Sequence, residues 1–122
     1  MSNNDTLHRF SAYQKACELF DLVVTDLTPL IRNPLCSRLV SQRMASADSI
    51  SANIEEGYGR KSRKDYSHFL IISRGSATET RGRYEQRLRH WLAGDIITAR
   101  VALCDEIIAI LSASIRTLRA SD

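Results

Sequence analysis

The chain contains few of the residues that interrupt, cross-link or anchor a fold: two prolines, five glycines and three cysteines among 122 residues. The cysteines are odd in number and widely spaced, and no C-x-x-C pair occurs, so the sequence predicts neither a disulfide scaffold nor a zinc site. No apolar run approaches the ~18 residues that span a bilayer, and the first ten residues lack the apolar core of a signal peptide. We therefore expect a cytoplasmic protein that does not enter a membrane.

Catalytic signatures are absent as well. The histidines, His8, His68 and His90, form no E-x-x-H pair of the kind that a di-iron site in a helical bundle uses. The segment GYGRKS lacks the spacing of a P-loop, and no serine or cysteine nucleophile motif occurs. The sequence therefore predicts no catalytic residue, no metal, no cofactor and no enzyme activity.

Most of the chain instead repeats apolar residues at three- and four-residue steps, which is typical of amphipathic helices. The predicted helices are residues 11–29, 34–56, 63–92 and 96–119. Because the connections are short, successive helices are expected to be antiparallel neighbours. The sequence thus predicts one all-α domain over residues 1–122, an up-down-up-down four-helix bundle.

Local patterns mark the predicted helix ends. The patterns at the four starts are Ser11 with Gln14, Asn33 with Pro34, Ser62 with Asp65, and Gly94 with Asp95 as the N-cap. Gly57 is expected to adopt the left-handed conformation that ends the second helix. Gly75 and Gly82 lie seven residues apart on the third helix, where we expect them to allow close packing against another helix.

Positive charge is unevenly distributed along the chain. Residues 57–91 carry nine cations and three anions, a net charge of +6, whereas the whole chain has a net charge of +3. Four of these cations fall within residues 60–64: Arg60, Lys61, Arg63 and Lys64. With a glycine-rich approach and the start of a helix, they predict a site for nucleic-acid phosphates. In the alternative interpretation, Glu55 and Glu56 neutralise them across the turn or across a subunit interface.

Two motifs resemble a known family. The segments SISANIEEGYGR and FLIISRGSATE are similar to the bacterial four helix bundle proteins, some of which are encoded by intervening sequences within 23S ribosomal RNA genes. The matching positions are Ser49, Ile50, Asn53, Ile54, Glu56, Gly57, Gly59, Arg60, Phe69, Leu70, Gly75, Ser76 and Glu79. Fainter similarity covers nearly the whole chain. Glu55 and the arginine-rich segment 81–89 depart from the family pattern.

This resemblance implies a left-handed four-helix bundle that assembles into a ring-like homopentamer. The family is also similar to the accessory proteins of diversity-generating retroelements, which are basic pentamers that bind nucleic acid and a reverse transcriptase. Glu79, with Ser76 in the second motif, is expected to be a buried acid that pairs with an arginine or is held by Ser76 or Asn53.

Two functions therefore remain open from the sequence. The first is non-enzymatic binding of RNA or DNA backbone by a basic rim formed by residues 60–64. The second is a protein–protein interaction scaffold, whose arginines pair with neighbouring subunits or with an acidic protein partner. Glu79 with Arg83 and Glu85 with Arg89 stand at i,i+4 and are expected as surface pairs. Pairing of all nine cations of residues 57–91 in an assembly would favour the scaffold, whereas exposure of the four cations at residues 60–64 on one face would favour nucleic-acid binding.

Overall fold

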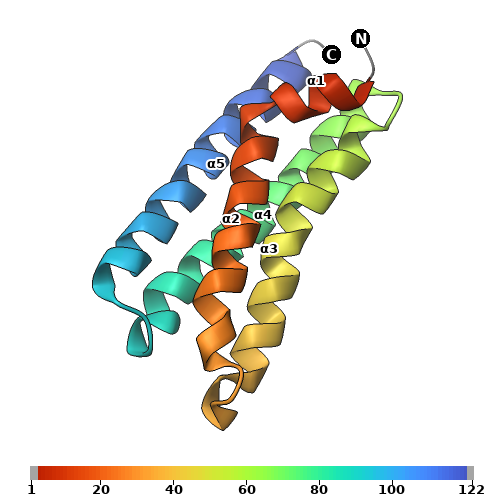
Figure 1. Cartoon of the computed structure of the whole chain (residues 1–122). Helices are drawn as coiled ribbons and strands as arrows, with labels where there is room; N and C mark the ends of the chain where they lie inside the picture. The colour runs from red at the N-terminus through yellow and green to blue at the C-terminus, as the bar shows by residue number, and fades with distance from the viewer. Residues whose placement is uncertain (1–2, 121–122) are drawn as a thin grey trace.

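The computed structural model describes residues 3–120, which form helices joined by short connections (Figure 1). The α-helices are α1 (Asn3–Arg9), α2 (Ser11–Leu27), α3 (Ser37–Tyr58), α4 (Arg63–Gln86) and α5 (Gly94–Ala120), and the 3₁₀ turns are η1 (Thr28–Leu30), η2 (Pro34–Cys36) and η3 (Leu88–His90). No strand occurs in this part of the chain, so the predicted all-α class is confirmed. None of the described helices is long and apolar enough to cross a membrane.

The long helices α2 to α5 lie side by side, and α1 crosses one end of them (Figure 1). Helix α4 packs against both α3 and α5, and α2 packs against α3 and α5. The α3–α4 connection lies at the same end as α1 and the last turns of α5, whereas η1, η2 and η3 lie at the opposite end. With 24 residues, α4 extends over about 36 Å between these two ends.

The sequence located the long helices but misplaced several of their ends. The first predicted helix stops at Leu27, two residues early, and continues as η1 with Pro29 in its first turn. The third ends at Gln86 rather than residue 92, and the fourth begins at Gly94, so that Asp95 lies in the first turn and is not the N-cap. These differences follow from 3₁₀ turns, which bend the chain between helices without breaking the apolar periodicity.

The predicted N-caps had mixed outcomes. Ser62 accepts a hydrogen bond from the Asp65 N–H at 3.0 Å, so this N-cap of α4 is confirmed. Asn33 accepts one from the Leu35 N–H at 3.0 Å, but it caps η2, and the predicted helix at residues 34–56 begins as α3 only at Ser37. The predicted Ser11 and Gln14 box is wrong, because α1 immediately precedes α2 and the cap residue is Phe10, without a side-chain hydrogen bond.

Gly57 does not end its helix. It is buried one residue before the end of α3, and no described glycine has a positive φ. A Cβ at Gly57 would lie 2.8 Å from the Phe69 Cβ of α4. The prediction of a left-handed C-terminus is therefore wrong, and Gly57 instead permits close approach of α3 and α4.

Gly75 and Gly82 show the reverse situation. A Cβ at either position would meet no atom within 4 Å, so the expected close packing does not occur within the chain. They lie on the face of α4 opposite Ala77 and Thr80, which are fully buried. This face of α4 is open.

The core contains one buried ion pair that joins three helices. Asp26 of α2 is 5% exposed and accepts hydrogen bonds from Arg100 of α5 at 2.7 and 3.0 Å. The Tyr84 hydroxyl of α4 donates to the same carboxylate at 2.6 Å. Burial and the adjacent Asp26 carboxylate raise the pKa of Tyr84, so the hydroxyl stays protonated as a donor. The rest of the core consists mainly of aliphatic side chains and includes the free, buried Cys36 and Cys104.

Replacing Asp26 tests the importance of this pair. Asp26→Ala leaves Arg100 in the core without its counter-ion, and we expect the free energy of unfolding to fall by about 3–5 kcal/mol, measured by urea denaturation. The control is Asp105→Ala, which removes the exposed partner of Arg81 and is expected to leave the midpoint nearly unchanged. Equal effects of the two substitutions would contradict the assignment.

Alanine at two glycines provides a second test. Gly57→Ala forces α3 and α4 apart, and we expect a loss of about 1–3 kcal/mol of stability. Gly75→Ala meets open space within the chain and removes a flexible helix residue, so the dissociated chain is expected to gain up to about 1 kcal/mol. Thermal unfolding measures both, and a stabilised Gly57→Ala variant would overturn the packing argument.

Candidate nucleic-acid interface

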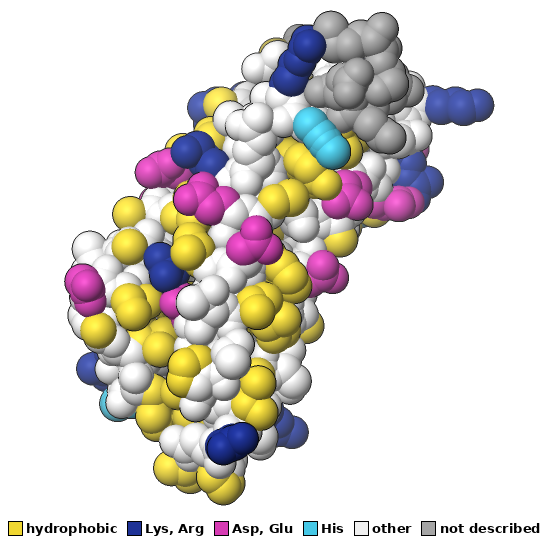
Figure 2. All heavy atoms as spheres, viewed as in Figure 1, with side chains coloured by type: hydrophobic (Ala, Val, Ile, Leu, Met, Phe, Trp, Pro, Cys, Tyr) yellow, Lys and Arg dark blue, Asp and Glu magenta, His cyan; other side chains and the backbone are white. Residues whose placement is uncertain are grey.

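The connection between α3 and α4 brings the four predicted cations to one end of the molecule. Arg60, Lys61, Arg63 and Lys64 are all exposed. Figure 2 shows Lys and Arg side chains projecting from this upper end, whereas acidic side chains appear further down the same face. We call these four residues together with Arg119 the basic end.

Part of the predicted neutralisation across the turn is present. Arg60 forms an ion pair with Glu56 one helical turn earlier, and its guanidinium lies 4.7 Å from the centre of the Phe69 ring. Glu55, however, accepts a hydrogen bond from the Tyr13 hydroxyl of α2 at 2.8 Å, which raises the pKa of Tyr13. Of the two glutamates, Glu56 pairs with a cation of the connection and Glu55 joins α3 to α2.

The start of α4 provides less for a phosphate than the sequence suggested. The Ser62 side chain accepts from the backbone N–H of Asp65, and Asp65 places a negative charge in the first turn. The long cationic side chains are therefore the main groups at this end that could contact a phosphate.

Arg119 is a cation of this end that sequence analysis missed. A cleft of about 290 Å³ between the first turns of α4 and the last turn of α5 is lined by Lys64, Ser67, His68, Ile71 and Arg119. The expected antiparallel order of α4 and α5 places the end of α5 beside the start of α4. This topology could have indicated that Arg119 lies near Lys64.

The other cations of residues 57–91 do not extend the basic end. Arg74 donates to Ser112 at 3.3 Å, and Arg81 pairs with Asp105 at 2.6 Å and with Glu85 at 3.5 Å. Arg87 and Arg89 lie at the opposite end, about 36 Å away along α4. The net charge of +6 of residues 57–91 is thus spread along the length of α4 and is not concentrated at the basic end.

The acidic partners also differ from those predicted. Glu85 pairs with Arg81 instead of Arg89, and Glu79 lies 3.7 Å from Arg43 instead of pairing with Arg83. Glu79 has a half-exposed side chain, so the expectation of a buried acid is wrong. The buried partner is the arginine, because Arg43 is only 1% exposed.

The remaining motif residues belong to the α3–α4 packing. Asn53 donates to the carbonyl and the hydroxyl of Ser49 at 2.8 and 2.9 Å, and Ser49 lies 2.8 Å from the Ser76 hydroxyl of α4. Gly59 is the C-cap of α3, with a φ of −77°. Tyr58 is half-buried and packs edge-on against Tyr66, with ring centres 6.2 Å apart.

Within the described residues, no group of three or more His, Cys, Asp or Glu side chains is placed to hold a metal ion.

Fold and charge together define a small all-α protein with one basic end. The family model of the 23S rRNA-intervening sequence protein matches residues 8–113, and the chain belongs to this family. The match confirms the family expected from the two motifs, and it extends from the end of α1 to most of α5. A comparison with curated proteins gave no match.

Proposed function

We propose that this protein is a non-enzymatic, oligomeric helical bundle that binds the phosphate backbone of RNA or DNA through its basic end. The observation that carries the proposal is the exposure of Arg60, Lys61, Arg63 and Lys64 on the α3–α4 connection and the first turn of α4. The cleft beside Lys64 adds Arg119 to them. The family name, which refers to ribosomal RNA, agrees with a role related to nucleic acid.

Binding of this kind recognises charge and not base sequence. Long, exposed cations replace condensed counter-ions on the backbone, and their flexible stems adapt to different phosphate positions. Tyr58 and Tyr66 pack against each other and both are partly buried, so neither is fully exposed for stacking on bases. We therefore expect structured RNA and duplex DNA of different sequence to bind similarly.

Replacing the connection's cations tests this function. We expect the variant with alanine at Arg60, Lys61, Arg63 and Lys64 to bind a labelled RNA hairpin roughly 100- to 1,000-fold more weakly at 0.1 M salt, measured by fluorescence anisotropy. The slope of log K against log salt should become shallower by about three for each chain that contacts the RNA.

The chain offers a control of equal charge. Arg32, Arg38, Arg87 and Arg89 are exposed at the opposite end, and their replacement by alanine removes the same four charges. This control is expected to bind RNA nearly as well as the natural chain. Equal loss in both variants would show that total charge decides affinity, and no binding by the natural chain at low salt would favour the interaction scaffold instead.

We further propose that the long helices form an up-down-up-down, left-handed four-helix bundle that assembles into a homopentameric ring. The open face of α4 at Gly75 and Gly82 supports a contact with another chain, because two glycines that touch nothing within the chain weaken the helix without a packing gain. A ring would repeat the basic end around one rim and so multiply its charge.

Leucine at these glycines tests the assembly. Gly75→Leu with Gly82→Leu is expected to retain full helicity by circular dichroism, because a single chain has room for both side chains. Light scattering after size exclusion is expected to show dissociation of the assembly. Ala102→Leu, on an exposed position of α5, is the control that should leave the mass unchanged. An unchanged mass in the double variant would show that this face is not an interface.

A further inference from the structure

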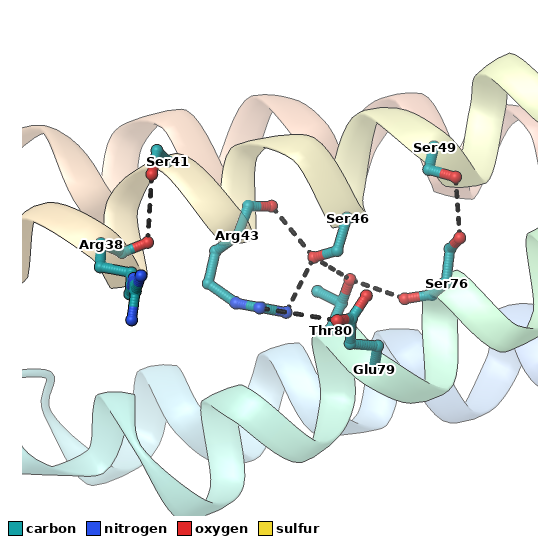
Figure 3. A network of polar contacts seen from close by, with 8 residues as sticks. All are labelled: Arg38, Ser41, Arg43, Ser46, Ser49, Ser76, Glu79 and Thr80. Atoms are coloured by element: carbon teal, nitrogen blue, oxygen red, sulfur yellow. Dashed lines mark hydrogen bonds and ion pairs between the residues drawn. The ribbon is translucent and has the colours of Figure 1, made fainter.

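A row of polar side chains lies between α3 and α4 (Figure 3). Arg43 of α3 donates to the Ser46 hydroxyl at 3.1 Å, and Ser46 in turn lies 3.0 Å from the Thr80 hydroxyl of α4. Thr80 also lies 2.8 Å from the Ser76 carbonyl, and Ser76 is 2.8 Å from Ser49. A row of hydroxyl groups on α3 and α4 therefore extends from the Arg43 guanidinium to Ser49 and Ser76.

Arg43 is incompletely partnered for a buried charge. Its side chain is 2% exposed, and its Nε is the one buried side-chain nitrogen or oxygen in the described residues that has no hydrogen-bond partner. Its nearest carboxylate, the half-exposed Glu79, is 3.7 Å from Nη2, too far for a good hydrogen bond. Burial lowers the pKa of Arg43; the Glu79 carboxylate partly opposes this effect, and the positive charge of Arg83 adds to it.

These groups line a cleft of about 380 Å³ that opens to the surface between α3 and α4. Its lining residues include two arginines, three serines and one glutamate: Arg43, Arg83, Ser46, Ser49, Ser76 and Glu79. Two positive groups against one negative group leave the cleft with a net positive charge. The two guanidinium groups and one hydroxyl of the Ser49–Ser76 pair are able to donate to a ligand, whereas Ser46 already donates its hydrogen to the Arg43 carbonyl at 3.2 Å.

We propose that this cleft binds a small oxyanion, a carboxylate or a phosphate, which accepts hydrogen bonds from the arginines and a serine. The anion adds a partner for the Arg43 guanidinium, and it competes with Glu79 for that arginine. Glu79 lies about 22 Å along α4 from Lys64, so the site is separate from the basic end. The proposal does not depend on nucleic-acid binding.

Isothermal titration calorimetry of the full chain with inorganic phosphate, and separately with succinate, tests the site at constant ionic strength. We expect saturable binding of at least one anion, weakened about tenfold or more in Arg83→Gln. Glu79→Gln removes the competing carboxylate and is expected to tighten binding severalfold. A response to phosphate alone identifies a tetrahedral ligand, and a response to succinate alone identifies a carboxylate.

Controls separate this site from the basic end and from loss of the fold. Arg87→Gln removes an exposed arginine near the end of α4, and the fourfold alanine variant at residues 60–64 removes the basic connection; both are expected to bind the anion as the natural chain does. Arg83 and Glu79 are at least partly exposed, so their variants are expected to fold. The absence of saturable binding of either anion, or binding lost in the fourfold variant but kept in Arg83→Gln, would overturn the proposal.

Discussion

The buried carboxylate of Asp26 constrains the arrangement of α2, α4 and α5 more strongly than any aliphatic contact. A carboxylate that is 5% exposed is tolerable only because Arg100 reaches both of its oxygens and Tyr84 donates to one of them. Aliphatic side chains tolerate a shift of one helix along another, whereas these three hydrogen bonds do not. The pair therefore fixes the relative height of the three helices, and with it the position of Arg119 beside the start of α4.

Helix α4 meets α3 mainly through short side chains. Toward α3 it presents small and hydroxyl side chains, and Ser73 donates to the Ile50 carbonyl at 2.7 Å. Gly57 allows the same two helices to approach closely beside Phe69. Further along α3, the hydroxyls of Ser46 and Thr80 lie within hydrogen-bond distance, and the long Arg43 side chain is buried beside them. Short polar side chains thus join the two helices along much of their length, and Arg43 is the one long polar side chain buried among them.

The apolar period was sufficient to predict the long helices, because burial of one face determines where a helix forms. It could not predict their ends, since η1 and η3 keep apolar residues at the same spacing, and α1 is short and polar. The cations at residues 60–64 are contiguous, so the sequence showed them directly. The pair of Asp26 with Arg100 joins residues 74 positions apart, and a single acid on an apolar face gives no sign of its partner. Arg43 was missed for the same reason.

Two positively charged regions beside α4 need not bind the same ligand. The basic end consists of exposed, flexible side chains, which suit a long polyanion whose phosphates differ in position. Arg43 is held in one orientation by burial and by Ser46, which suits a compact anion of defined shape. A buried arginine without full partners costs stability that an apolar side chain of similar size would not. Packing alone therefore explains an arginine at this position poorly, whereas an anion that completes its hydrogen bonds offsets the cost.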